Sequence, residues 1–201
     1  MSGRNTSRPA TYFEELYAAN PDPWNFASSD YEKTKYAATI AALEDRNFHN
    51  VFEIGCSIGI LTKLLSARCR SLLAIDLVET ALADARKYCA GLPHVRFENF
   101  SVPYVWPSDR SFDLIICSEV LYFLSPRDIA RVAHLATGSI LPGGWILLVN
   151  FTGPIDEPCS GDDAAKIFID ACRGALVLRK CVRAESFRID LLERQSQPIP
   201  R

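Results

Sequence analysis

The sequence predicts an α/β protein built on a doubly wound sheet, and three observations lead to this prediction. Short apolar segments alternate with stretches of amphipathic helical pattern along the middle of the chain. The first apolar segment runs directly into a glycine-containing loop that opens a helix. The last two apolar segments follow each other with only a short turn between them. We therefore expect seven strands, the first five parallel and the last two in a C-terminal antiparallel hairpin at one edge, with helices on both faces.

The predicted parallel strands have the β-branched or continuous apolar character of strands that are buried on both faces. They cover residues 49–54, 71–77, 95–100, 112–118 and 145–150. Amphipathic helical patterns lie between them, at residues 59–67, 78–90 and 127–137. Gly143 and Gly144 predict a tight turn into the fifth strand, because glycine adopts backbone conformations that larger residues avoid.

Further helical patterns lie toward the two ends of the chain, at residues 12–19, 31–43 and 162–172. The first two are separated by Pro21-Asp22-Pro23-Trp24, which cannot continue a helix. The two hairpin strands cover residues 175–183 and 186–193. We therefore expect one Rossmann-like domain of residues 1–201, in which residues 1–45 form an N-terminal helical lid or substrate segment.

The composition indicates an ordinary soluble protein. With 201 residues, of which 48% are hydrophobic and 23% charged, the chain is long enough to bury one sizeable core. A formal net charge of -2 gives no global attraction for nucleic acid or an anionic membrane, so we expect neither as a partner. No apolar segment of a secretion signal follows the polar residues 1–8, and no later apolar run is long enough to cross a bilayer.

The cysteines favour a reducing compartment. They are seven, an odd number, and widely spaced, with no Cys-x-x-Cys pair and no neighbouring histidines that would form a zinc site. Several lie in apolar runs, as Cys117 does, where a thiol behaves as a small hydrophobic group. We therefore expect reduced cysteines, no metal and a cytoplasmic location.

The glycine loop after the first strand predicts the kind of ligand. The loop reads Glu53-Ile54-Gly55-Cys56-Ser57-Ile58-Gly59, and its glycines allow a tight turn and a close approach of ligand to backbone. A dinucleotide fingerprint would place further glycines where Ser57 and Ile60 stand, which weighs against NAD. The spacing instead resembles motif I of class I methyltransferases. That resemblance implies that Glu53 and the loop backbone hold the methionine portion of S-adenosylmethionine.

Asp76 ends the second predicted strand and follows Gly55 by the distance at which a carboxylate accepts hydrogen bonds from two ribose hydroxyls. NAD enzymes share this distance, so Asp76 supports an adenosine-type ligand rather than one cofactor. The plainer interpretations are a tight turn for the glycine pair and a helix cap for Asp76.

The fourth strand ends in polar residues beside this loop, because the first and fourth strands flank the point where the strand order reverses. Glu119 and Tyr122 follow that strand and are the candidate catalytic residues. Three roles are open to them: to hold the methionine portion, to present a substrate, or to take a proton from the nucleophile. For an amine acceptor, Glu119 would stabilise the ammonium or relay its proton. The plainer interpretation of Glu119 is a helix cap.

Several segments together resemble the methyltransferase family typified by nodulation protein S, which N-methylates a deacetylated chitooligosaccharide. The closer marks of this family are Asp22-Pro23-Trp24, Tyr31-Glu32-Lys33-Thr34-Lys35 and Glu119-Val120-Leu121-Tyr122. The resemblance implies methyl transfer from S-adenosylmethionine, with S-adenosylhomocysteine as product, to the amino group of a small-molecule or saccharide acceptor. A catalytically silent S-adenosylmethionine-binding scaffold is the alternative, and an NAD-dependent oxidoreductase ranks third.

The resemblance also implies a set of site residues. The cofactor-binding set is Glu53, Gly55, Cys56, Ser57, Gly59, Asp76, Leu77, Ser101, Val102 and Ser118. Ser101 stands where many relatives carry an acid that contacts the adenine amine, so here the hydroxyl or the neighbouring backbone would make that contact. Trp24 and Tyr31 are the candidate substrate-binding residues, with core packing as the plainer interpretation of their aromatic rings.

Overall fold

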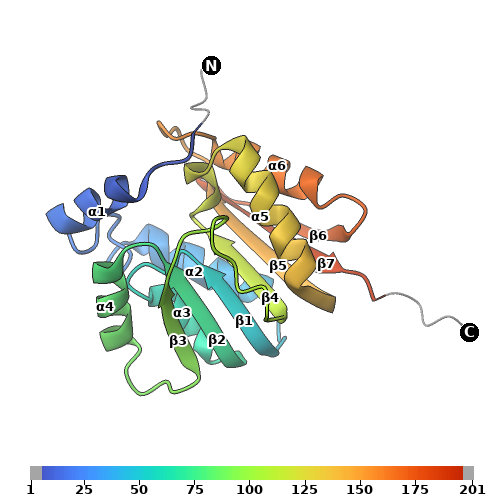
Figure 1. Ribbon diagram of the computed structural model, residues 1–201, viewed down its shortest axis with the longest axis horizontal. Coiled ribbons are helices and arrows are strands. Elements are labelled where there is room, and N and C mark those ends of the chain that lie inside the picture. The colour runs from blue at the N-terminus through green and yellow to red at the C-terminus, as the bar shows by residue number, and fades with distance from the viewer. Residues whose placement is uncertain (1–5, 197–201) are drawn as a thin grey trace, which may run out of the picture.

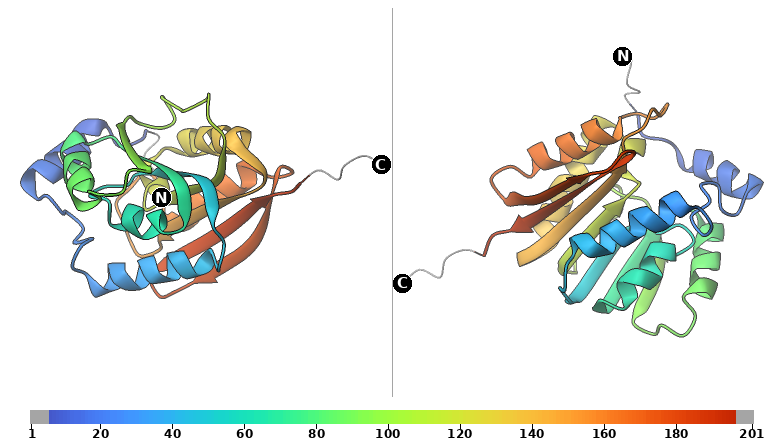
Figure 2. Two further views of the ribbon diagram at one scale, coloured as in Figure 1. Left: turned by 90° about the horizontal axis from the view of Figure 1, so that it is seen from below. Right: turned by 180° about the vertical axis from the view of Figure 1, so that it is seen from behind.

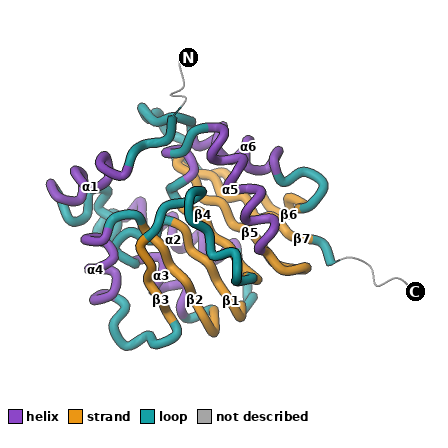
Figure 3. The backbone as a smooth tube through the Cα atoms, viewed as in Figure 1, coloured by secondary structure: helices purple, strands orange, loops and turns teal. Residues whose placement is uncertain are grey.

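A seven-stranded mixed sheet forms the centre of the computed structural model, which describes residues 6–196 (Figures 1 and 3). In spatial order its strands are β3 (Val95–Asn99), β2 (Cys69–Asp76), β1 (Phe48–Ile54), β4 (Phe112–Ser118), β5 (Ile140–Phe151), β7 (Phe187–Arg194) and β6 (Leu176–Arg183). β1 to β5 pair in parallel, and β7 pairs antiparallel with both β5 and β6. This confirms the predicted doubly wound sheet with a C-terminal hairpin at one edge.

Helices cover both faces of the sheet, because each strand sends alternate apolar side chains to opposite sides. On β1, Val51 packs with the cluster beneath α2 (Asp30–Ala42), α3 (Ile60–Ser66) and α4 (Glu79–Tyr88). Phe52 packs with the cluster beneath α5 (Pro126–Ser139) and α6 (Gly161–Ala171). Figure 1 shows α5 and α6 in front of the sheet, and Figure 2, seen from behind, shows α2 running across its back. None of these described helices is long and apolar enough to cross a membrane.

The N-terminal helix α1 (Ala10–Ala19) stands apart from the sheet, near the start of α4 (Figure 1). Its Tyr17 packs with Val78 and Ala81, and Trp24 of the following turn adds to that small cluster. A short 3-10 helix, η1 (Leu121–Phe123), follows β4. α1 and η1 therefore bring N-terminal and central residues to the same end of the sheet.

The fifth strand begins earlier than the sequence predicts. β5 starts at Ile140, which pairs with Phe112, and the ladder with β4 shifts register before Leu114. Gly143 has a φ of +77°, and a Cβ on Gly144 would lie 2.8 Å from the carbonyl oxygen of Leu141. The glycines therefore make an irregularity within the strand, where the sequence predicted a turn that precedes it.

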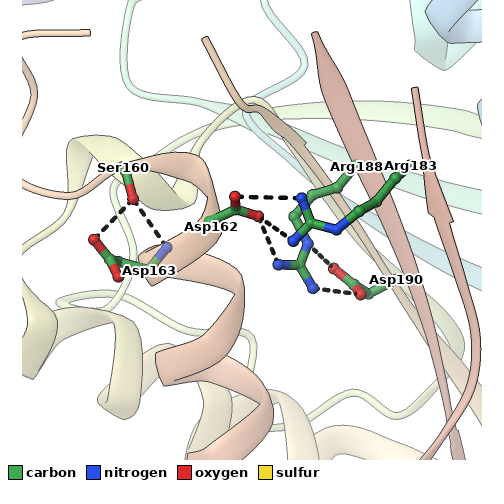
Figure 4. Close-up of polar contacts among 6 residues, drawn as sticks. All are labelled: Ser160, Asp162, Asp163, Arg183, Arg188 and Asp190. Atoms are coloured by element: carbon green, nitrogen blue, oxygen red, sulfur yellow. Dashed lines mark hydrogen bonds and ion pairs between the residues drawn. The ribbon is translucent and has the colours of Figure 1, made fainter. Parts of the chain in front are cut away.

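A charged network joins α6 to the hairpin (Figure 4). Arg188 donates to both carboxylate oxygens of Asp190, at 2.8 Å each, and to Asp162 at the start of α6, also at 2.8 Å. Arg183 donates to Asp162 from β6. The carboxylate of Asp190 is fully buried, and the guanidinium of Arg188 supplies the counter-charge and hydrogen bonds that such a group needs.

We expect Asp162→Asn to lower the free energy of unfolding by about 1 kcal/mol at pH 7, since the pair is partly exposed. Hydrogen bonds from Arg183, followed by those from Arg188, hold the pKa of Asp162 below its usual value. The stabilisation is therefore complete above the ordinary pKa of an aspartate and is lost as the pH falls. Urea unfolding at pH 7 and pH 3 measures this difference. Asp163→Asn on the same helical turn is the control, and equal losses in both variants at pH 7 would contradict the prediction.

Candidate active site

The main cavity lies at the carboxyl ends of β1, β2 and β4, where the strand order reverses. Ten of the residues predicted for the site line it: Trp24, Gly55, Ser57, Asp76, Leu77, Ser101, Val102, Ser118, Glu119 and Tyr122. A smaller pocket adjoins it and shares Gly55, Ser57, Ser118 and Glu119 with it. Glu53 and Cys56 line this smaller pocket. Elements far apart in sequence thus meet around one continuous site.

The glycine loop turns sharply after β1 because its backbone bonds to the neighbouring strand. The amides of Gly55 and Cys56 both donate to the carbonyl oxygen of Ile75, at 2.8 and 2.9 Å. Gly55 has a φ of +77°, and a Cβ there would collide with the side chain of Val120. Glycine at position 55 therefore lets the loop pack against the segment that follows β4.

Gly59 allows the glycine loop to pack against a neighbouring helix. It has a φ of +83° and immediately precedes α3. A Cβ there would lie 3.1 Å from the Cβ of Ala85 on α4. Gly59 therefore allows close packing of the loop on α4, and it is not among the residues that line the two pockets. Its predicted contact with the cofactor stays a prediction.

Asp76 braces the glycine loop and also faces the cavity. One carboxylate oxygen accepts from the amide of Ser57 at 2.9 Å, and the other accepts from the amide of Val78 at 3.0 Å. Burial raises the pKa of Asp76, and these backbone donors oppose the rise. Each carboxylate oxygen has further lone-pair capacity, so the same side chain can hold the loop and accept from ligand hydroxyls.

Glu53 is a buried acid whose Oε2 has no hydrogen-bond partner among the described residues. Burial raises the pKa of Glu53 to about 7; the hydroxyl of Thr62 opposes the rise, and the nearby charge of Asp76 adds to it. An unpaired buried acceptor of this kind costs about 1–3 kcal/mol. A ligand ammonium in the smaller pocket would remove that cost, so Glu53 fits the amino group of a bound amino acid.

We expect the affinity for S-adenosylhomocysteine to increase about eightfold from pH 6 to pH 7.5. The ammonium needs the ionised carboxylate, and with a pKa of about 7 Glu53 is mostly protonated at pH 6. Calorimetry at pH 6 in two buffers of different ionisation enthalpy should therefore show proton release on binding. Glu53→Gln should bind more weakly and without this pH dependence. A wild-type affinity that is constant over the range would count against the assignment.

Leu77, Phe100, Ser101 and Val102, which follow β2 and β3, form another part of the wall of the main cavity. The Ser101 hydroxyl donates to the carbonyl oxygen of Val102 at 3.4 Å, which leaves the hydroxyl oxygen free to accept. Apolar walls with one acceptor suit a flat ring that carries an amino group. The geometry thus fits the adenine contact expected for Ser101.

Glu119 and Tyr122 form a hydrogen-bonded pair at the end of β4. Glu119 has a φ of +58°, an uncommon conformation that carries strain in a non-glycine residue. The Tyr122 hydroxyl donates to Glu119 Oε2 at 2.8 Å, while Oε1 has no partner among the described residues. Burial raises the pKa of Glu119, and Lys35 and Tyr122 oppose the rise. The carboxylate is thus engaged by side chains and lines the cavity, which favours a chemical role over that of a helix cap.

Of the two candidate substrate-binding aromatics, Trp24 lies at the cavity. Its ring packs against those of Tyr17, Phe26 and Phe123, with centroids 5.7, 5.5 and 6.2 Å away. Tyr31 instead packs edge-on against Phe151 and Phe187. Trp24 thus both packs and lines the cavity, whereas Tyr31 lies in the packing between α2 and the sheet.

Glu32 and Lys35 are functional candidates to which sequence reasoning gave no role. Lys35 Nζ lies 2.8 Å from Glu32 Oε1 and 3.5 Å from Glu119 Oε2, and the lysine side chain is only 1% exposed. The available signal was on α2, where the charged residues Glu32 and Lys35 share the buried face with Tyr36 and Thr39 at helical spacing. A charged core face is unusual and marks a site.

The strand order, the glycine loop and the strand-terminal aspartate together define a domain with the class I methyltransferase fold. The family described as nodulation protein S (NodS) matches residues 13–143. The chain therefore belongs to the NodS family, as its motifs predict.

Individual relatives support this membership. Nodulation protein S of Rhizobium tropici is 31% identical over 134 residues, which are 64% of this chain and 55% of that protein. The chain thus spans about half the length of this relative. Phosphoethanolamine N-methyltransferase 1 of Arabidopsis thaliana is 26% identical over 121 residues, which are 59% of this chain and 25% of that protein.

Solved structures confirm the fold. N-methyltransferase NodS of Bradyrhizobium japonicum WM9, in complex with S-adenosyl-L-homocysteine, superposes with a TM-score of 0.79 at 20% identity, covering 93% of this chain and 99% of that one. A structure described as a putative methyltransferase from Pseudomonas syringae has a TM-score of 0.71 at 30% identity, covering 82% and 99%. The common fold therefore includes nearly all of both solved chains.

Proposed function

We propose that this protein transfers a methyl group from S-adenosylmethionine to the amino group of a small-molecule or saccharide acceptor. The observation that carries the proposal is the meeting, around one continuous site, of an adenosine-type end, an unpaired buried acid for an ammonium, and the Glu119–Tyr122 pair. Membership of the NodS family supports the same reaction.

The cofactor fits the unsatisfied polar atoms of the site. Glu53 would bind the ammonium of the methionine portion, with the backbone of Gly55, Cys56 and Ser57 along it. Asp76 would accept from the ribose hydroxyls. Leu77, Ser101 and Val102 would hold the adenine. Ser118 lines both pockets and would contact the cofactor between its adenosine and its methionine portion. The bound sulfonium supplies an electrophilic methyl carbon.

The residues beyond the cofactor loop act on the acceptor. Glu119 receives the proton as the nitrogen–hydrogen bond breaks and leaves its electron pair on nitrogen. That nitrogen would then have a free electron pair for the methyl carbon of the bound donor, whose sulfur would leave as a neutral thioether. Tyr122 holds the Glu119 carboxylate in place through its hydroxyl. Orientation of the acceptor nitrogen toward the methyl carbon supplies most of the rate enhancement, because the sulfonium is already cationic and needs no further activation to leave.

The N-terminal segment, residues 1–45, serves in this proposal as the lid and part of the acceptor site. Within its described part, the hydroxyl of Tyr17 bonds to that of Ser57 on the glycine loop, and Trp24 offers an aromatic face to a sugar ring. Tyr31 would contribute indirectly, because its ring centre lies 5.1 Å from Lys35 Nζ and packs against that charged group. All seven cysteines are free thiols, which supports a cytoplasmic location.

Two measurements test the proposal. Calorimetry should show binding of S-adenosylmethionine and S-adenosylhomocysteine in preference to NAD; a preference for NAD would favour the oxidoreductase. Incubation with methyl-labelled cofactor and a panel of amino sugars, oligosaccharides and small amines should then yield a labelled amine. Cofactor binding without transfer to any acceptor would favour the silent scaffold.

A further inference from the structure

The buried cluster of Glu32, Lys35, Glu119 and Tyr122 has one feature that the proposed reaction does not use. It joins α2 to the end of β4, and each carboxylate employs only one of its two oxygens within the cluster. Glu32 Oε2 and Glu119 Oε1 are buried and have no partner among the described residues. Two acceptors are thus left open in one cluster.

The two carboxylates that carry these open oxygens lie at the wall of the main cavity. Glu32 and Glu119 both line it, although Glu32 is only 5% exposed. Lys35 is 1% exposed and bridges the two carboxylates at 2.8 and 3.5 Å. The acids therefore form part of the cavity wall, while the lysine supports them from within the protein.

The formal charge of the cluster shows what kind of group is missing. Ionised Glu32 and Glu119 carry two negative charges, and Lys35 supplies one positive charge. When both acids are ionised, one negative charge remains in a buried setting, which raises the pKa of Glu119 and calls for a counter-charge with hydrogen bonds. A cation that donates hydrogen bonds would complete the cluster, whereas a neutral hydroxyl would leave the charge unbalanced.

We propose that Glu32 and Glu119 together form a binding site for the ammonium group of the methyl acceptor, with one N–H donated to Glu32 Oε2 and one to Glu119 Oε1. This inference rests on the proposed function, and it makes Glu32 the residue that selects amines over alcohols. Lys35 is a positioning residue that keeps the two carboxylates together in spite of their like charges. When Glu119 takes a proton from the ammonium group, Glu32 keeps its hydrogen bond to the acceptor nitrogen.

The test uses the full chain saturated with S-adenosylhomocysteine and two disaccharides as probes. Fully deacetylated chitobiose carries amino groups where cellobiose carries hydroxyls. At pH 7 we expect the wild type to bind the amino disaccharide at least about tenfold more tightly, because charged hydrogen bonds contribute most of the difference. Glu32→Gln should reduce that preference at least about fivefold and keep the affinity for S-adenosylhomocysteine within about twofold.

Asp30→Asn is the matched control, since it removes a carboxylate from the same helix where the side chain is 95% exposed and paired with Lys33. It should leave both affinities unchanged. Equal binding of the two disaccharides by the wild type would overturn the inference, as would a folded Glu32→Gln protein with the wild-type preference. Failure of the proposed function is a separate result: the amine preference would persist while labelled cofactor yields no product.

Discussion

Asp76→Ala is expected to weaken the binding of S-adenosylhomocysteine at least about 100-fold. The variant removes the carboxylate proposed to accept from two ribose hydroxyls, and each hydrogen bond to a charged group contributes about 1.5–3 kcal/mol. It also releases the amides of Ser57 and Val78, so the glycine loop loses a brace. Calorimetry gives the affinity, and thermal unfolding without ligand measures the loss of the brace.

The chain offers a matched control for this variant. Asp113, at the start of β4, also accepts from two backbone amides, those of His49 and Asn50, at 2.6 and 2.8 Å. It lies at the opposite end of the parallel strands, away from the cavity. Asp113→Ala should therefore lower stability with little change in affinity. If both variants weakened binding equally, the effect of Asp76→Ala would reflect general destabilisation and the ribose contact would be rejected.

Glu119→Gln is expected to lower turnover about 100- to 1,000-fold and to change the affinity for S-adenosylhomocysteine less than about threefold. A positioned base contributes a factor of this order, and glutamine keeps the shape of the side chain without its basicity. Burial raises the pKa of Glu119, so activity should increase with pH as the carboxylate ionises. Single-turnover methyl transfer across a pH series measures both effects.

A companion variant and a control sharpen this prediction. Tyr122→Phe removes the donor that favours the ionised carboxylate, so the pKa of Glu119 and the acid limb of the pH profile should both move upward. Glu98→Gln on β3, whose carboxylate pairs with Arg110 near the surface, should retain wild-type turnover. Unchanged turnover in a folded Glu119→Gln protein would reject a catalytic role for this residue.

Strong local patterns made most of the fold predictable. The parallel strands are apolar runs such as Leu114-Ile115-Ile116, and burial on both faces leaves such runs few alternatives. The predicted start of β5 was wrong because the strand begins where Ile140 pairs with Phe112, a residue distant in sequence, and the register shifts after that pair. Boundaries set by such long-range contacts leave little trace in local sequence.

The candidate site also has one part that the sequence pattern predicts and one part that depends on tertiary contacts. Gly55 and Asp76 stand at the ends of neighbouring strands, so the sequence pattern alone brings them together. The packing of Gly59 against Ala85 depends on the approach of α4, and the ion pair of Lys35 with Glu119 depends on how α2 crosses the sheet. Helical spacing places Glu32 and Lys35 on the buried face of α2, but it does not encode their tertiary partners, which is why these residues had no predicted role.

The charged face of α2 has a consequence for how new specificities can evolve in this protein. The groups proposed for the methyl donor lie between Glu53 and Ser118, whereas Glu32 belongs to a helix that precedes the sheet. Recognition of the donor and choice of the acceptor are thus encoded in separate stretches of the gene. Substitutions within α2 can redirect the enzyme to other amines while the donor site is inherited intact.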